Sequence, residues 1–173
     1  MLVEGSHFLP GIPPAALGHR ALAVNLSDLA AMGAEPLWCT LALSLPEARA
    51  GWLDEFAEGF FLLADRAGIT LIGGDTVRGP LAVNVTALGA VEPGRAVLRR
   101  GARPGDQVWV SGTPGDAVAG RLLLATPASI PPDRGAEAAW LQQRFLRPEP
   151  RLALGRHLAG LATAMLDVSD GLH

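Results

Sequence analysis

Lysine and tyrosine are absent from this chain of 173 residues, and all fourteen basic residues are arginine. Without lysine the chain has no Schiff-base chemistry, no Walker-type phosphate lysine and no protein-kinase lysine. Any nucleotide phosphate must therefore be held by backbone N–H groups, arginine or a metal ion. Biased genomic composition is an alternative reason for the missing lysine, and the chemical exclusion holds under either explanation.

Cysteine, long apolar runs and excess positive charge are also scarce. The single cysteine, Cys39, excludes an internal disulfide and fits a reducing compartment, where we expect it to be a small buried residue. No run of about 18 apolar residues predicts a membrane span, and the first residues do not resemble a signal peptide. The net charge of −3 gives no basis for nucleic-acid binding. We therefore expect a cytoplasmic protein that binds neither nucleic acid nor membrane.

Two helices are predicted in the first third of the chain. Prolines at positions 13 and 14 favour a helix start, and Gly33 ends the helix after Met32. A stripe at i, i+3/i+4 spacing on this helix places one acid among apolar residues: Leu17, Ala21, Val24, Asp28 and Met32. We expect this helix to be buried, and a buried carboxylate such as that of Asp28 is costly unless a hydrogen-bond donor or a cation pairs with it. A second amphipathic helix follows Pro46 and ends at Gly68.

Strand patterns alternate with these helices. Strands are predicted over 38–45, 69–72 and 81–88, with the Gly-Gly-Asp stretch at 73–75 as the loop after the second of them. Beyond a domain boundary near residue 102, strands are predicted over 107–111 and 164–167, and helices over 136–146 and up to about residue 161. Interleaved strands and helices indicate an α/β or α+β protein.

Four acidic residues stand in three short motifs. Asp28 belongs to Asn-Leu-Ser-Asp, Asp75 to Gly-Gly-Asp-Thr, and Asp167 and Asp170 to Asp-Val-Ser-Asp-Gly. Carboxylates among glycines and apolar residues repel one another unless a cation joins them, and oxygen ligands of this kind suit Mg²⁺. Taken singly, each motif has an ordinary structural explanation: a hydrogen-bonded helix residue, a tight turn, or a capped helix start.

Read together and in order, these motifs resemble the thiamine-monophosphate kinase family. The resemblance rests on Val-Glu-Gly-x-His-Phe at 3–8, Asn-Leu-Ser-Asp at 25–28, Leu-Ile-Gly-Gly-Asp-Thr at 71–76, Gly-Ala-Arg-Pro-Gly-Asp at 101–106 and Asp-x-Ser-Asp-Gly at 167–171. It covers essentially the whole chain. The wider superfamily includes aminoimidazole-ribonucleotide synthetase and selenophosphate synthetase.

The resemblance implies a fold and a reaction. The expected fold is an α+β N-terminal domain, residues 1–102, with a mixed sheet and helices on one face, followed by the first part of an α/β C-terminal domain, residues 103–173. The implied reaction transfers the γ-phosphoryl group of ATP to thiamine monophosphate with Mg²⁺, by direct in-line displacement. A homodimer through the N-terminal domain is also implied.

Site residues are implied by the same resemblance. The expected Mg²⁺ ligands are Asp28, Asp75, Asp167 and Asp170. The expected ATP contacts are Gly74, Asp75, Arg99 and Ser169, with Asp75 and Arg99 acting in catalysis, and His7 is the expected contact to thiamine monophosphate.

Two alternatives remain open from the sequence. One is another ATP-using enzyme of the same superfamily that acts on a different phosphate or carboxylate acceptor. The other is a catalytically incomplete dimerisation or nucleotide-binding module. The family pattern extends beyond both ends of this chain, with further acidic and thiamine-binding residues, so we expect the sequence to be a fragment of a longer enzyme.

Overall fold

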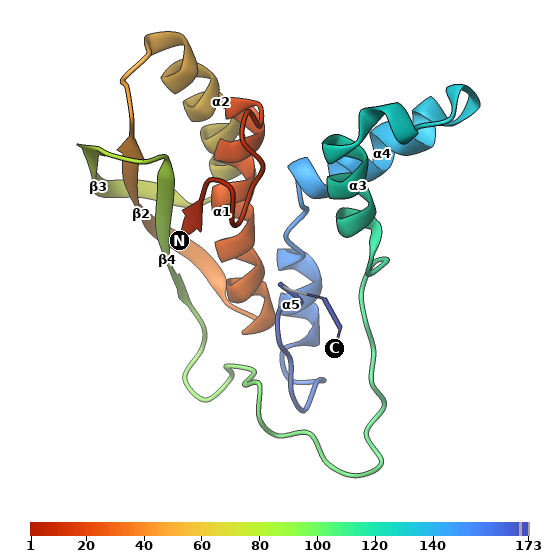
Figure 1. The fold of residues 1–173 in the computed structure, drawn as a ribbon. Coiled ribbons are helices and arrows are strands. Elements are labelled where there is room, and N and C mark those ends of the chain that lie inside the picture. The colour runs from red at the N-terminus through yellow and green to blue at the C-terminus, as the bar shows by residue number, and fades with distance from the viewer. Residues whose placement is uncertain (170, 173) are drawn as a thin grey trace.

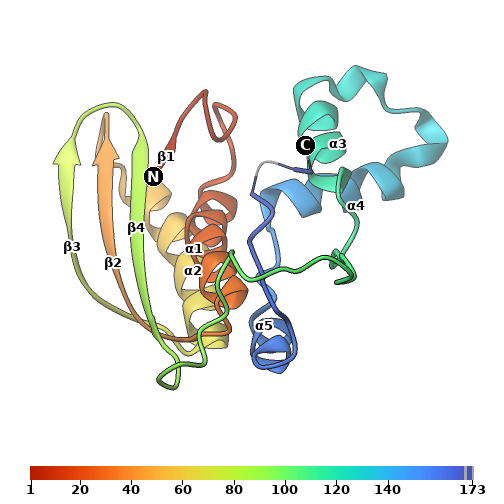
Figure 2. The same cartoon turned by 90° about the horizontal axis from the view of Figure 1, so that it is seen from below.

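The N-terminal half of the chain folds as a sheet covered on one face by two helices. The computed structural model describes residues 1–169 and 171–172. Its mixed sheet has the strand order β1-β4-β2-β3, with bounds Leu2–Val3 for β1, Glu35–Leu45 for β2, Thr70–Arg78 for β3 and Ala82–Ala90 for β4. Helices α1 (Pro14–Ala31) and α2 (Ala50–Ala67) cover one face, and the other face is open (Figure 1, Figure 2). The predicted fold class is confirmed.

Pairing in the sheet combines both strand directions. β2 runs parallel to β3 and antiparallel to β4, and β1 runs antiparallel to β4. The register of β2 and β3 shifts at Ile72, because Cys39 pairs with Leu71 and Thr40 with Gly73. The extra residue is a β-bulge, which changes the local twist of the edge strand.

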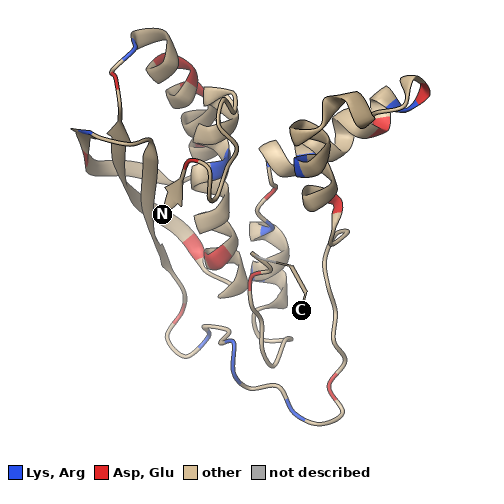
Figure 3. Ribbon diagram, in the orientation of Figure 1, with Lys and Arg blue, Asp and Glu red and all other residues tan. Residues whose placement is uncertain are grey.

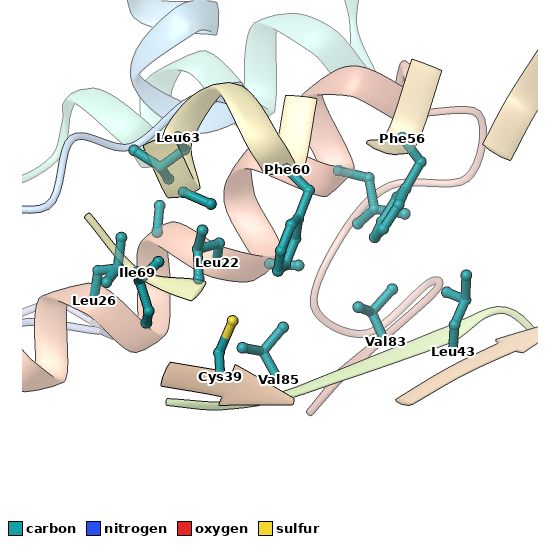
Figure 4. Close-up of a cluster of buried hydrophobic side chains, with 14 of the residues drawn as sticks. Leu22, Leu26, Cys39, Leu43, Phe56, Phe60, Leu63, Ile69, Val83 and Val85 are labelled. Carbon is teal, nitrogen blue, oxygen red and sulfur yellow. The ribbon is translucent and has the colours of Figure 1, made fainter. Parts of the chain in front are cut away.

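The core lies between the sheet and the two helices. Alternate strand residues point toward the helices, and Cys39, Leu43, Val83 and Val85 are all buried there (Figure 4). They meet apolar side chains of α1 and α2: Leu22, Leu26, Phe56, Phe60 and Leu63. The expectation that Cys39 is a small buried residue is therefore confirmed.

Glycines allow α1 and α2 to approach closely. A Cβ on Gly59 of α2 would lie 1.9 Å from the carbonyl oxygen of Ala15, and one on Gly18 of α1 would lie 2.1 Å from that of Phe56. Both helices end as the sequence predicts, at Gly33 and Gly68, which adopt φ values of 69° and 70° that favour glycine.

The second half of the chain is helical within the described residues. After an irregular segment over 91–115 come α3 (Asp116–Ala125), two short 3₁₀ helices (Pro127–Ser129 and Pro132–Arg134), α4 (Gly135–Leu146) and α5 (Leu152–Leu158). α3 and α4 pack on each other, and α5 lies against α1 (Figure 1). None of the helices that the structure describes has both the length and the hydrophobicity to cross a membrane.

Two side chains of α1 attach the second half through polar contacts. The buried His19 donates from Nε2 to the carbonyl oxygen of Pro148 over 3.0 Å. The guanidinium of Arg20 donates to the carbonyl oxygen of Phe145 and lies 4.3 Å from the centroid of its ring. α1 is therefore a structural element of both halves.

Four predictions about local structure were wrong. The Gly-Gly-Asp stretch at 73–75 is not a loop, because β3 continues through it and pairs with β2 as far as Arg78. Residues 107–111 and 164–167 do not form strands, since neither segment joins the described sheet. The last helix ends at Leu158 and not near residue 161.

Candidate functional site

Asp28 and Asp167, which are far apart in the sequence, come together beside the C-terminal half of α1. Ser27, next to Asp28 on the helix, donates from its hydroxyl to Oδ1 of Asp167. Partial loss of hydration beside neighbouring groups, and secondly the nearby Asp167 carboxylate, raise the pKa of Asp28. Two predicted Mg²⁺ ligands are therefore neighbours.

The environment of Asp28 differs from the one predicted. Its side chain is exposed and does not lie inside the apolar stripe of α1, whose buried face is formed by Leu22 and Leu26. Asp28 lies instead on the flank of the helix that meets the second half of the chain. The carboxylate therefore keeps contact with solvent, and the hydrophobic core does not have to accommodate its charge.

The segment that carries Asp167 is held by the loop between β4 and α3. The backbone N–H of Met165 donates to the carbonyl oxygen of Leu98 over 3.1 Å. The Thr163 hydroxyl donates to Oδ2 of Asp106 over 2.6 Å, and the same oxygen accepts the Arg103 backbone N–H. The Met165 bond anchors the irregular segment two residues before Asp167. The bonds from Thr163 and Arg103 hold the pKa of Asp106 below its usual range.

Arg99 and Ser169 lie close in sequence to these contacts. Arg99 directly follows Leu98 in a loop that carries four arginines (Figure 3), and its side chain is exposed. Ser169 is exposed two residues beyond Asp167. Asp170, the fourth predicted Mg²⁺ ligand, lies outside the described residues. The two segments that meet at the bond from Met165 to Leu98 therefore carry Arg99 and Ser169 in addition to Asp167.

Asp75 lies elsewhere, on the open face of the sheet. It pairs with Ala42 of β2 and lines a shallow hollow with Ala42, Ser44 and Asn84, side chains that face away from α1 and α2. Its Oδ1 accepts the backbone N–H of Thr76 over 2.8 Å. Within one copy of the chain, the sheet separates Asp75 from the pair beside α1.

Gly74 has a structural reason to be glycine. Its φ is 152°, and a Cβ at this position would lie only 1.8 Å from the carbonyl oxygen of Leu41 in β2. The neighbouring Gly73 has nothing within 4 Å of the corresponding position. Packing of β3 against β2 therefore accounts for Gly74 without any ligand.

His7 is placed by a turn at the opposite edge of the sheet. Nδ1 of its ring accepts the backbone N–H of Val3 over 3.1 Å, and the backbone N–H of His7 donates to the Val3 carbonyl oxygen. Because Nδ1 accepts, the ring proton is on Nε2, which can donate to a ligand. The side chain is exposed, and β4 and β2 lie between β1 and the strand of Asp75.

The chemistry of the Asp28 and Asp167 pair fits a hard divalent cation. Carboxylate oxygens with room for water are ligands that Mg²⁺ prefers. In residues 1–169 and 171–172, no group of three or more His, Cys, Asp or Glu side chains could hold a metal ion. Among the described residues, the candidate oxygen donors beside α1 are therefore the carboxylates of Asp28 and Asp167.

Ser27 is the residue that sequence reasoning missed. Its position next to Asp28 in Asn-Leu-Ser-Asp was a signal that a hydroxyl accompanies the carboxylate along the helix. Nothing in the spacing indicated that its partner would be Asp167, because 140 positions separate the two residues.

Comparison with known proteins shows what the chain is similar to. Residues 1–91 match the family model described as AIR synthase related protein, N-terminal domain. The thiamine-monophosphate kinase of Salmonella typhimurium is 50% identical over 171 residues, a match that covers 99% of this chain and 52% of the relative. The chain thus spans about half the length of the curated relatives it matches.

Solved structures agree with this similarity. A crystal structure of thiamine-monophosphate kinase from Stenotrophomonas maltophilia K279a superposes with a TM-score of 0.87 at 50% identity, over 94% of this chain and 52% of that one. A structure described as AaThiL complexed with AMPPCP and TMP superposes with a TM-score of 0.91 at 36% identity, over 99% of this chain and 54% of that one.

Proposed function

The chain belongs to the AIR synthase related family, and within it we propose that the chain is the ATP- and Mg²⁺-binding part of a thiamine-monophosphate kinase. The proposed reaction transfers the γ-phosphoryl group of ATP to thiamine monophosphate and yields thiamine diphosphate and ADP. The observation that carries the proposal is the 50% identity to the Salmonella typhimurium kinase over 99% of the chain. The AMPPCP in the solved complex is an analogue of ATP, which supports ATP as the phosphoryl donor.

Asp28 and Asp167 would hold Mg²⁺, and Asp170 would join them from outside the described residues. When bound, the cation neutralises charge on the phosphate oxygens. Arg99, exposed beside the Asp167 segment, would stabilise the same charge, and Ser169 would contact ATP. The acceptor is a phosphate oxygen that is already ionised at neutral pH, so direct in-line transfer needs no strong general base.

His7 would bind the phosphate of thiamine monophosphate. With Nδ1 engaged by the Val3 backbone, the ring presents Nε2–H, which is a donor suited to a phosphate oxygen. The role is binding and orientation. Gly74 would let the backbone approach ATP, in addition to its structural role against Leu41.

A homodimer would bring Asp75 close to Asp28 and Asp167, although the three residues lie on opposite sides of the sheet within one copy. The open face of the sheet carries apolar side chains that are 45–58% exposed: Trp38, Ile72, Val77 and Leu88. A second copy packed against this face would cover these side chains. Asp75 lies on the same face and would reach a site formed between the two copies, where it would act as a Mg²⁺ ligand. We also propose a cytoplasmic location, since the reaction consumes ATP and Cys39 is a free thiol.

ADP release in the presence of different acceptors tests the proposal. With the gene product that contains this chain, Mg²⁺ and ATP, we expect thiamine monophosphate to be the only strong acceptor. Strong turnover with a different phosphate or carboxylate acceptor would identify another ATP-using enzyme of the superfamily and contradict the proposal. Mass spectrometry of the product separates thiamine diphosphate from simple ATP hydrolysis.

A further inference from the structure

Ser27 makes a contact that is unusual for a serine inside a helix. Polar side chains in helices often bond to the carbonyl group four residues earlier, and Asn25 does so by donating to Ala21 over 2.8 Å. Ser27 lies two residues further along α1 and donates instead to Asp167, across 140 positions of sequence. Its hydroxyl is therefore directed at a carboxylate of the other half of the chain.

The receiving carboxylate is carried by a segment without regular structure. Helix α5 ends at Leu158, and the next backbone bond to the loop after β4 is made by Met165. Asp167 follows two residues later. The bond from Ser27 ties the Asp167 carboxylate to the helix α1.

Helix geometry then relates the two acids. Ser27 and Asp28 are consecutive on α1, so the helix fixes the hydroxyl and the Asp28 carboxylate relative to each other. When the hydroxyl binds Oδ1 of Asp167, it orients the second oxygen of that carboxylate as well. A hydrogen bond that orients a metal ligand in this way affects metal affinity although the donor does not touch the metal.

We propose that Ser27 is a positioning residue, which holds the Asp167 carboxylate beside Asp28 in the arrangement that a divalent cation requires. This inference rests on the proposed function for the identity of the two ligands. It adds a role for the third residue of the Asn-Leu-Ser-Asp motif, whose hydroxyl acts through Asp167 and not on substrate.

Binding of Mn²⁺ alone tests the proposal, because Mn²⁺ takes the same oxygen ligands and the signal of the free ion is visible by electron paramagnetic resonance. In Ser27→Ala we expect the Kd for Mn²⁺ to rise by about tenfold or more. Alanine favours the helix, so the variant should fold. Ser27→Thr keeps a hydroxyl at this position, so its Kd for Mn²⁺ should stay within about threefold of the value for the protein without substitutions.

Thr163→Ala is the matched control. Thr163 lies in the same segment as Asp167, and its hydroxyl also bonds to an aspartate, Asp106 of the loop after β4. The substitution removes that bond and leaves the bond from Ser27 to Asp167 in place. We expect its Kd for Mn²⁺ to stay within about threefold of the unchanged protein, while circular dichroism verifies folding in all variants.

The outcomes separate this inference from the proposed function. An unchanged Kd in Ser27→Ala, or an equal loss in Thr163→Ala, overturns the role of Ser27 and leaves the kinase proposal intact. The expected Kd pattern without turnover of thiamine monophosphate supports the role of Ser27 and overturns the proposed substrate. A chain that binds no Mn²⁺ overturns both the metal ligands and the role of Ser27.

Discussion

Replacing Gly74 with alanine should destabilise the sheet strongly. The added Cβ would lie 1.8 Å from the Leu41 carbonyl oxygen, a backbone atom that moves only if β2 and β3 separate. Overpacking of this kind costs about 1–3 kcal/mol. The φ of 152°, which alanine adopts poorly, adds about 1–3 kcal/mol. The total of about 2–6 kcal/mol is a large part of the roughly 5–15 kcal/mol that stabilises an ordinary domain.

Gly73→Ala is the control for this prediction. The same methyl group one residue earlier meets nothing within 4 Å, so stability should rise or fall by no more than about 1 kcal/mol. Urea unfolding followed by tryptophan fluorescence measures both variants, and Gly74→Ala should lower the midpoint by more than about 1 M. Equal midpoints for the two variants would refute the packing explanation and leave a ligand contact as the reason for glycine at position 74.

Three further predictions concern the site and the two helices. Asp75→Asn should abolish turnover, while the free energy of unfolding stays within about 0.5 kcal/mol because the side chain is exposed. Rates equal to those of the unchanged protein would rule out a metal role for Asp75. Burial lowers the pKa of His19 from its ordinary 6.5, so the unfolded chain binds the proton more readily than the folded protein. The free energy of unfolding should therefore be highest above about pH 6.5 and should fall as the pH drops from that value toward the lower pKa of folded His19. His19→Gln keeps a donor for Pro148 and should flatten the pH dependence of urea unfolding. Gly59→Ala should cost about 1–3 kcal/mol in the same assay because α1 blocks the methyl group, whereas Gly51→Ala, in open space on the same helix, should leave stability unchanged or raise it by up to about 1 kcal/mol.

The elements that sequence predicted well are those whose signals are local. Pro14 begins α1, and Gly33 and Gly68 follow the ends of α1 and α2, because proline and glycine act on the backbone within a residue or two. Alternating apolar residues marked β2 and β4 because one face of each strand is buried in the core. These patterns do not depend on which segment is the neighbour in space.

The elements that sequence predicted poorly depend on a distant partner. Gly73 and Gly74 favour a turn locally, yet pairing with β2 extends them as a strand. Residues 107–111 have the composition of a strand but no neighbouring strand among the described residues, and Val108 and Trp109 are 94% and 84% exposed. A strand requires a partner as well as a propensity, so the pattern alone misled the prediction.

The site shows the same division. Family resemblance predicted Asp28 and Asp167 as Mg²⁺ ligands, and the structure brings the two residues together beside α1. Asp75 was grouped with them, but sheet register places it on the opposite face. The face on which a strand residue lies depends on the bulge at Ile72, and no property of the Gly-Gly-Asp motif specifies that bulge.

Helix α1 shows why the sequence predicted a buried helix but did not predict the polar partners of that helix. Its buried face packs on the sheet through Leu22 and Leu26, whereas His19 and Ser27 bond to the second half of the chain. Eight residues of helix separate these two bonds by about 12 Å, so they limit rotation of the second half about α1. The separation of Asp28 and Asp167 is therefore set by contacts that leave the apolar face of the helix untouched. Core packing holds one face of α1, and polar contacts on the other face set the position of Asp167 relative to Asp28. A periodicity that predicts the helix therefore does not predict the partner of Ser27.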